Sequence, residues 1–358
     1  MTLTLATLSA AGDPASRRLF ADRFAAATAE LRSGEHGQHP PSAGYTQLVL
    51  SLAATRRSEL FMVMDGESVV ARALIAESFA HSGASALGLF EASLDRIDRA
   101  GEVIIDAASK WARASALPEI FAPLDVNTWL SYRFLVHAKK PAGPPLYSWE
   151  PAQPPEYREL FQRLGFEEAE RYHTIGLQHA GDAGLADGIR QTAPARAAAE
   201  HAGYRFEQLR NADDIGALID ELHPLCVDAF RDNPLFEPVP LEVFRRLQMA
   251  AAATRDCSLS HVVRQPTGAL AGFVFVFLDR GEVVIKTIAV RPEARGRHIS
   301  TALVHVVLAA AAERGYETIV SALVREGNTS EFLSRSHMHE DVRTWRRDYV
   351  LLRRRVGE

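Results

Sequence analysis

The sequence has few cysteines and no long apolar run. Its 358 residues contain two cysteines, Cys226 and Cys257, whose spacing is not that of a metal site. We expect both to be small buried hydrophobic residues in a reducing cytoplasm, with no bound metal. No stretch of ~20 apolar residues occurs, so we expect no membrane span. The first residues include no basic leader, so we expect no signal peptide.

An excess of positive charge is also absent. The formal net charge is -5 and the pI is about 6.2, which does not indicate a nucleic-acid partner. The composition, 47% hydrophobic and 24% charged, is that of a soluble globular protein. A chain of this length favours two domains over one. We therefore expect a two-domain cytoplasmic protein, either a monomer or a homodimer.

The most informative stretch runs from residue 281 to residue 338. It contains a β-branched strand (Glu282–Val290), a basic turn (Arg291–His298), an apolar helix (Ile299–Arg314) and a second strand (Thr318–Val324). Strand, loop, helix and strand in this order form a crossover unit, so the two strands are expected to run parallel.

The basic turn is a candidate anion site. Backbone N–H groups at a helix N-terminus point toward solvent and, together with the helix dipole, attract anions. Arg295 and Arg297 add positive charge, and Ser300 and Thr301 add hydroxyl donors in the first turn. A pyrophosphate fits this donor set, whereas the alternative interpretation is a solvated basic turn.

Residues 290–303 resemble the pyrophosphate-binding motif of the GNAT acyltransferases, which reads Arg/Gln-x-x-Gly-x-Gly/Ala. When the motif is aligned on Arg295, His298 stands at the first glycine and Ser300 at the second. His298 either presents its backbone N–H as the glycine would or blocks the site. The resemblance is strongest over residues 257–350.

The resemblance implies an α+β fold with a mixed sheet and an acyl-CoA site. The pantetheine arm would enter a gap between the strands at 282–290 and 318–324, and a backbone N–H would hold the thioester carbonyl. The residues that the resemblance assigns to acyl-CoA are Ile288, Ala289, Val290, Arg295, Gly296, Arg297, His298, Ile299, Ser300, Thr301 and Asn328.

The two halves of the chain resemble each other. Glu119–Thr128 and Thr318–Thr329 both follow a strand and a helix, and both reach Asn-Thr just past a strand. Leu160–Phe166 likewise matches Phe332–Met338, and a closing strand follows each. We interpret this as a duplication that produced two tandem GNAT-like domains, whereas the alternative is chance matching of short apolar words.

The duplication predicts the domain boundaries. Residues 1–180 form a degenerate GNAT-like domain, 181–199 a linker, and 200–358 the acyl-CoA-binding domain. The degenerate domain has no Arg-Gly-x-Gly turn, and acids in its loop would repel a diphosphate. It also carries an aromatic and proline-rich insertion, 129–155, which is too rich in proline for regular structure.

Several single elements are also predicted. Strands at Leu60–Met64 and Ser68–Ala76 are joined by Asp65-Gly66, a strong hairpin signal. Helices are expected at Ile97–Ala114, Asp213–Phe230 and Leu241–Ala253.

Amine acylation requires a base, because a free alkylamine has a pKa near ~10.4. Family members often place a Glu on the strand that contains Glu282, or they use water. Glu282 lies at the strand's beginning, where it could instead be a plain hairpin charge. Lys286 and Thr287 are nearer to the expected reaction centre, but neither is an ordinary base. Asp228 and Glu237 are further candidates whose simpler interpretation is structural.

The departing thiolate needs a proton. Many relatives supply a Tyr seven residues after the Asn, but Arg335 occupies that position. Ser334, Ser336, His337 or water could take this role, and His337 could equally be a drifted turn residue.

The leading hypothesis is an acyl-CoA-dependent N-acyltransferase that transfers acetyl to a primary amine by direct attack on the thioester. The acceptor would be a small-molecule or peptide amine, bound at the junction of the domains and shaped by the 129–155 insertion. The alternatives are a non-catalytic acyl-CoA sensor, and a GNAT protein that performs O-acyl transfer or uses a longer acyl or acyl-carrier-protein donor.

Overall fold

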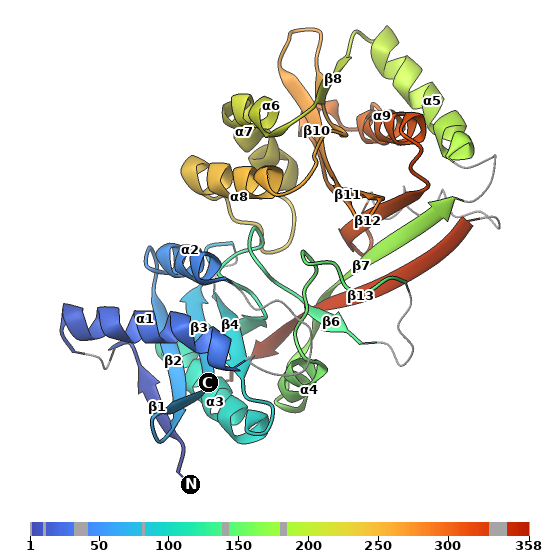
Figure 1. Ribbon diagram of the computed structural model, residues 1–358. Helices are drawn as coiled ribbons and strands as arrows, with labels where there is room; N and C mark the ends of the chain where they lie inside the picture. Colours follow the sequence, from blue (N-terminus) through green and yellow to red (C-terminus); the bar gives the residue numbers. More distant parts are fainter. Residues whose placement is uncertain are drawn as a thin grey trace.

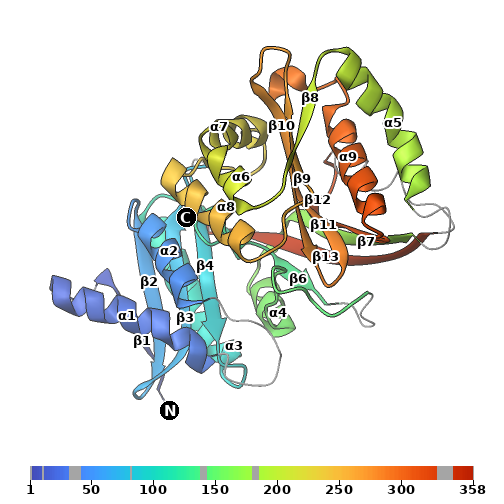
Figure 2. The same cartoon turned by 45° about the horizontal axis from the view of Figure 1, so that its top comes forward.

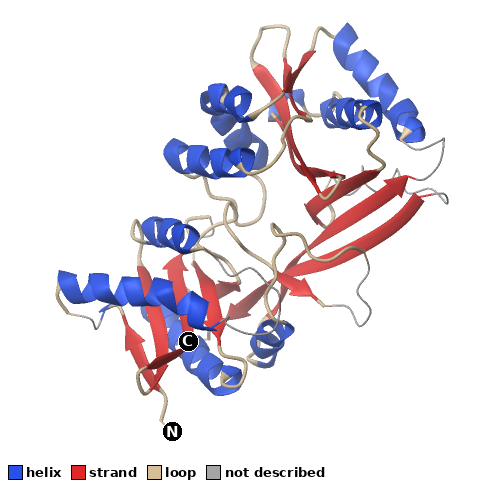
Figure 3. Ribbon diagram, viewed as in Figure 1, coloured by secondary structure: helices blue, strands red, loops and turns tan. Residues whose placement is uncertain are grey.

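One continuous mixed sheet runs through the whole molecule, with helices on both of its faces (Figures 1 and 3). Thirteen strands belong to it among the described residues. The α+β class predicted from the sequence is confirmed. The computed structural model describes residues 2–9, 12–31, 42–80, 83–137, 143–179, 185–328 and 342–357.

The first half of the chain, which ends at residue 179, alternates strands and helices. The predicted hairpin is confirmed, because β2 and β3 pair along their whole length and Gly66 has the positive φ of +63° that its turn requires. The elements of this half are β1 (Thr4–Thr7), α1 (Pro14–Leu31), α2 (Ala43–Ala53), β2 (Ser58–Asp65), β3 (Ser68–Glu77), β4 (Ala84–Ala92), α3 (Ile97–Ala114), β5 (Glu119–Ala122), β6 (Phe134–Val136), α4 (Pro155–Arg163) and β7 (Glu167–His179).

The second half begins at residue 185 with one additional helix, α5, and then follows a similar order from β8 to β12, with three helices where the first half has α1 and α2. Its elements are α5 (Ala186–His201), β8 (Arg205–Leu209), α6 (Ala212–Ala217), α7 (Ile219–Phe230), α8 (Leu241–Ala253), β9 (Ser260–Arg264), β10 (Leu270–Asp279), β11 (Glu282–Val290), the 3₁₀ turn η2 (Pro292–Ala294), α9 (Ile299–Glu313), β12 (Thr318–Arg325) and β13 (Val342–Arg355).

Two predictions for the second half are wrong. The helix expected at 213–230 is split into α6 and α7 at Leu218, which follows the weak helix former Gly216. The linker expected at 181–199 is helical from residue 186 onward. Its alanines favour a helix, and α5 packs on α9, where the Thr192 hydroxyl lies 3.0 Å from His305 Nδ1. The domain boundaries themselves stay a prediction.

The proline-rich insertion also contains one short regular element. Residues 134–136 form β6, which pairs antiparallel with β13. The described residues 143–154 otherwise form turns and irregular structure, as predicted.

Both halves use the same strand arrangement. In each, a run of antiparallel strands leads to a parallel pair joined by a helix, β4/β5 around α3 and β11/β12 around α9. Equivalent hydrogen bonds mark the end of the last antiparallel pairing before the parallel pair, from Ser93 N to Val70 O and from Arg291 N to Ala271 O, both 2.9 Å long. The internal repeat seen in the sequence is therefore a structural repeat.

The last strand of each half pairs with the other half. β7, from the first half, pairs with β12, while β13, from the second half, pairs with β5. The two long strands also pair with each other, and Figures 1 and 2 show them side by side between the halves. This exchange makes the two halves one sheet, and the sequence predicted the two strands but not their exchange.

The exchanged strand β13 contributes to the core of the first half. Val350 and Leu352 are fully buried there against Ile104 of α3 and Phe161 of α4. Burying a Val or Leu side chain contributes roughly 1.5–3 kcal/mol. Removal of β13 would therefore cost the first half several kcal/mol, a large part of the stability of a domain.

We predict that neither half folds cooperatively alone. A fragment ending at residue 180 lacks the partner of β5, and a fragment starting at residue 185 lacks the partner of β12. Thermal denaturation followed by circular dichroism should show no cooperative transition for either fragment and a restored one for the equimolar mixture. A native-like melting temperature for a single fragment would contradict the role given to the exchange.

Candidate functional site

The strands β11 and β12 separate after a short parallel pairing. Their register includes three pairs, Val283 with Ile319, Val284 with Val320 and Ile285 with Ser321. β11 nevertheless continues to residue 290, paired on its other side with β10. The edge of β11 that faces β12 therefore stops pairing with β12 at Lys286, and from there on its backbone groups are open to a ligand. The predicted separation of these strands is confirmed.

The exchanged strand β7 holds the gap open. Beyond Ser321, β12 follows β7, and Val324 is in register with His173. The backbone N–H of Leu323 donates to the Thr174 hydroxyl of β7 over 3.1 Å, so it points away from β11. Thr174 comes from the first half of the chain, so the open gap in the second half depends on both.

The equivalent gap between β4 and β5 is closed. Leu124 occupies the position of Leu323 in the repeat, but its N–H donates to the Leu87 carbonyl of β4 over 2.9 Å. One residue further, the Asp125 carboxylate accepts the N–H of Leu89 at 2.7 Å. A Cβ atom on Gly88 would lie 2.5 Å from the Leu124 carbonyl oxygen, so the segments are in direct contact. No space remains there for an acyl-pantetheine arm.

Asp125 is an unusual carboxyl group in this closed gap. Burial raises its pKa to about 6, although hydrogen bonds from Leu89 and Tyr45 act in the opposite direction. The Tyr45 hydroxyl donates to the second carboxylate oxygen at 2.7 Å. The carboxylate thus occupies backbone and side-chain donors that would otherwise face a ligand.

The loop that follows β11 has the conformation expected of a glycine-containing anion loop. Gly296 has φ +75° and His298 has φ +57° and ψ 22°, both in the left-handed region. His298 therefore stands where a glycine is preferred and adopts the glycine's conformation, for which His is one of the better substitutes. The next N–H groups, those of residues 299–301, begin α9 and have no intrahelical partner. The loop of the first half, residues 93–96, is shorter and carries Asp95.

The arginines of the loop differ in their partners. The Arg295 guanidinium donates to the Ala229 carbonyl at 2.8 Å and lies 3.4 Å from Asp232, at the C-terminal end of α7. Arg297 is exposed, and Ser300 and Thr301 are half-buried at the start of α9. Arg291 instead forms a 2.6 Å ion pair with Asp228.

One cavity of about 1080 Å³ connects the open gap with the first half. Ile285–Ile288 of β11, the far end of β12 and Asn328 line one end of it, while Tyr45 and Asp125 line the other. Ile288 and Asn328 are thus the predicted acyl-CoA residues that reach the cavity, whereas the loop residues 295–301 lie outside its lining.

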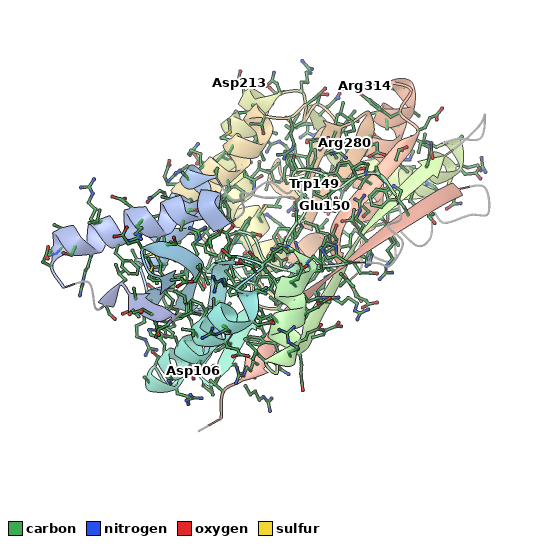
Figure 4. All side chains as sticks on the ribbon, turned by 60° about the horizontal axis from the view of Figure 1, so that its bottom comes forward. Asp106, Trp149, Glu150, Asp213, Arg280 and Arg314 are labelled. Atoms are coloured by element: carbon green, nitrogen blue, oxygen red, sulfur yellow. The ribbon has the colours of Figure 1, made fainter. Side chains whose placement is uncertain are left out.

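The insertion forms a wall of the cavity with its aromatic side chains. The rings of Tyr147 and Trp149 stack at 5.0 Å, and Trp149 Nε1 donates to Asp279 at 3.1 Å. Arg280 holds the insertion from the second half by donating to the carbonyls of Pro145 and Leu146. Figure 4 shows Trp149 and Arg280 close together in the middle of the molecule.

A buried ion pair fixes the same wall. Glu150 is paired with Arg347 of β13 at 2.8 Å and accepts a hydrogen bond from Tyr349. Figure 4 places Glu150 beside Trp149. The insertion is therefore positioned by residues of both β10 and the exchanged strand β13.

Of the three predicted catalytic residues, only Glu282 lies within the described part of the chain. Glu282 begins β11, outside the cavity lining, and accepts a hydrogen bond from Tyr147. Burial raises its pKa, and the Arg347 charge partly opposes this. Ser334 and His337 lie outside the described residues. The further candidates Asp228 and Glu237 form ion pairs, Glu237 with Arg56 at 2.6 Å.

Lys286, which the sequence placed near the expected reaction centre but did not favour as a base, is a functional candidate in the structure. It lies at a bulge of β11, since Phe275 pairs with Thr287 and Val276 with Ile285, and its side chain lines the cavity. Burial, with smaller contributions from the charges of Arg133 and Arg255, lowers its pKa to about 7. From the sequence, only the position of Lys286, one residue past the last expected parallel pair, could have indicated that it faces the cavity.

The described part of the chain has neither a candidate metal site nor a candidate membrane span. There, His, Cys, Asp and Glu form no group of three that could hold a metal ion. Its helices include none with the length and apolar character needed to cross a bilayer.

Comparisons with known proteins agree with this architecture. Residues 190–322 match the family model described as acetyltransferase (GNAT) domain, and no curated protein matches the chain. The fold is similar to that of a tandem GNAT protein from the clavulanic acid biosynthesis pathway, with 14% identity, a TM-score of 0.56 and coverage of 100% of this chain and 99% of that chain. A GCN5-related N-acetyltransferase from Kribbella flavida is 13% identical, with a TM-score of 0.52 and coverage of 99% and 72%. The predicted fold of two tandem GNAT-like domains is confirmed.

We predict that Gly88→Ala destabilises the protein. Its Cβ would meet backbone atoms of Leu124 and Asp125, which cannot move without breaking the closed gap, at a cost of about 1–3 kcal/mol. Gly44→Ala is the matched control, because that glycine has open space around it within α2. Urea denaturation should show a lower free energy of unfolding for Gly88→Ala alone, and equal stability of both variants would argue against a closed gap.

Proposed function

We propose that this protein, whose fold is that of the tandem GNAT acetyltransferases, transfers the acyl group of an acyl-CoA to an amine. The observation that carries the proposal is the contrast between its two duplicated gaps. The β11/β12 gap is open and leads to a glycine-like loop at a helix N-terminus, whereas the backbone closes the β4/β5 gap. The donor therefore binds to the second half.

The donor site uses backbone groups more than side chains. The exposed edge of β11 from Ile288 to Val290 pairs with the pantetheine arm as an added strand would, and Asn328 contacts the arm from the other side of the gap. One N–H of this edge holds the thioester carbonyl as negative charge develops on its oxygen. The pyrophosphate binds at residues 295–301, where Arg297 is exposed and Arg295 is shared with the end of α7.

Lys286 is the proton acceptor in this proposal, in preference to Glu282. A lysine with a pKa near 7 is partly neutral at neutral pH and can take a proton from the attacking ammonium group. The acceptor nitrogen then bonds to the carbonyl carbon as the carbon–sulfur bond breaks. Lys286 returns its proton to the thiolate, and the second proton of the acceptor nitrogen leaves to solvent as the amide forms. Ser334 and His337 stay candidates for that last step, and acetyl transfer to a primary amine is the simplest form of the reaction.

Calorimetry with acetyl-CoA tests the donor site. We expect binding by the wild type and several-fold weaker binding by Arg295→Ala, because a positive charge near the diphosphate is lost. No binding of acetyl-CoA, and no protection by longer acyl-CoAs, would defeat the donor proposal. An unchanged affinity of Arg295→Ala would refute the assignment of this side chain to the pyrophosphate.

The conformation of the loop supplies a matched pair of control variants. His298→Gly keeps the left-handed conformation and should retain binding. His298→Val should weaken it, because a β-branched residue strongly disfavours that conformation.

Release of free thiol from acetyl-CoA with a panel of amines then separates an enzyme from a sensor.

We predict that the rate of acyl transfer depends on the ionisation of Lys286. Since the neutral form is the active one, kcat/KM should rise with pH through about 7, the pKa given by burial. Lys286→Met should lower kcat by about 10²–10⁴-fold and remove this inflection, while acetyl-CoA binding persists. A variant with an unchanged pH profile would exclude Lys286 as the base.

A further inference from the structure

Arg133 is a buried cation with no carboxylate partner. Its exposed fraction is 7%, and it forms no ion pair with any described residue. One guanidinium nitrogen donates to the Tyr132 hydroxyl, and the group lies over the rings of Tyr132 and Tyr172, at 3.7 and 4.2 Å. Among the residues that the structure describes, the buried Nε has no hydrogen-bond partner. The backbone φ of +108° is a strained value for a non-glycine residue, and such strain is often found at functional sites.

Other deeply buried arginines of this chain are paired. Arg56 lies 2.6 Å from Glu237, Arg72 lies 2.9 Å from Glu91, and Arg347 lies 2.8 Å from Glu150. An unpaired buried charge is costly, so folds supply a partner for it or reserve it for a ligand. Arg133 differs from these three because its immediate neighbours are aromatic rings.

The position of Arg133 indicates which ligand would pair with it. It lines the same cavity as Lys286, and its charge is close enough to lower the pKa of that lysine. The carboxylates that also line the cavity already have strong donors: Glu91 has Arg72, Glu150 has Arg347, and Asp125 has Tyr45 and the Leu89 N–H. The unsatisfied group beside the open gap is therefore positive.

We propose that Arg133 binds the carboxylate of the acceptor, so that the acceptor is an amine of the amino-acid type. The inference rests on the proposed acyl transfer and specifies its substrate class. A guanidinium pairs with a carboxylate through charge-assisted hydrogen bonds, and Nε is free to donate one of them. With the carboxylate held at Arg133, the amino group is directed toward Lys286. A polyamine is disfavoured, because Arg133 and Lys286 would repel its additional charges.

Matched acceptors test this subsite on the wild-type protein. Phenylalanine and phenethylamine differ by the carboxylate alone, and phenylalaninamide keeps the shape without the charge. With acetyl-CoA as donor, we expect kcat/KM to be about 10- to 100-fold higher for phenylalanine, as expected for a hydrogen bond to a charged group. Equal values for the three acceptors, or a preference for the amine, would overturn the inference while leaving acyl transfer intact.

Variants at position 133 assign the preference to Arg133. Arg133→Met should lose it by lowering kcat/KM for phenylalanine far more than for phenethylamine, whose value changes only through the loss of the Arg133 charge beside Lys286, and Arg133→Lys should restore part of the preference. Tyr132→Phe, which removes the hydroxyl that accepts from Arg133, is a milder second variant if Arg133→Met does not fold. A preference that persists in Arg133→Met would refute the assignment.

A binding measurement separates this inference from the proposed function. N-acetylphenylalanine, the product of the proposed reaction, should raise the melting temperature of the wild type but not that of Arg133→Met, with no donor present. If this stabilisation occurs in a protein that releases no thiol, the carboxylate subsite stands and the enzymatic proposal fails. If thiol is released but N-acetylphenylalanine stabilises both proteins equally or neither, the subsite is wrong and acyl transfer stands.

Discussion

The exchange of the last strands between the two halves is the constraint on which the rest of this structure depends. Thr174 of β7 accepts the N–H of Leu323, and this bond turns β12 away from β11 just where the parallel pairing ends. β13 in turn closes the first half's core and positions the insertion through Arg347. Each half therefore completes the other, and the cavity lies where the two meet. A change that weakened the exchange would affect stability and the candidate site together.

The duplicated halves show how one strand arrangement supports two outcomes. Gly88 and Lys286 occupy equivalent positions in the two halves. Each lies three residues past a residue, Ser85 or Val283, that is paired at the same point of its parallel strand pair. In the first half the absence of a side chain at Gly88 lets the segment after β5 pack directly on β4, and Asp125 takes the remaining donor. In the second half a long cationic side chain occupies the equivalent position, and the strands stay apart. Small local differences thus decided which half can accept a ligand.

The electrostatics of the cavity follow from burial rather than from net charge. The chain as a whole has a net charge of -5, yet Lys286 and Arg133 beside the open gap have no carboxylate partner among the described residues. Most buried carboxylates of the cavity lining have nearby donors of their own. A positive end next to an aromatic wall suits a ligand that carries an anion and an apolar body. This pattern could not be inferred from composition, because it depends on which charges find partners.

The sequence by itself determined the local elements and their order. Alternating apolar residues, the Asp65-Gly66 turn and the βαβ spacing around residues 282–324 are short-range signals, and the hairpin, the parallel pair and the repeat followed from them. The arginines and the glycine of the loop after Val290 likewise predicted a basic turn before a helix, and the structure adds that His298 adopts a left-handed conformation there. Tertiary structure alone decided the exchange of β7 and β13, the closing of one gap by Asp125 and the lowered pKa of Lys286. The exchange depends on pairing between strands more than 100 positions apart, and the closed gap on contacts of Asp125 with Leu89 and Tyr45. The lowered pKa depends on burial, and none of these leaves a periodic signal in the sequence.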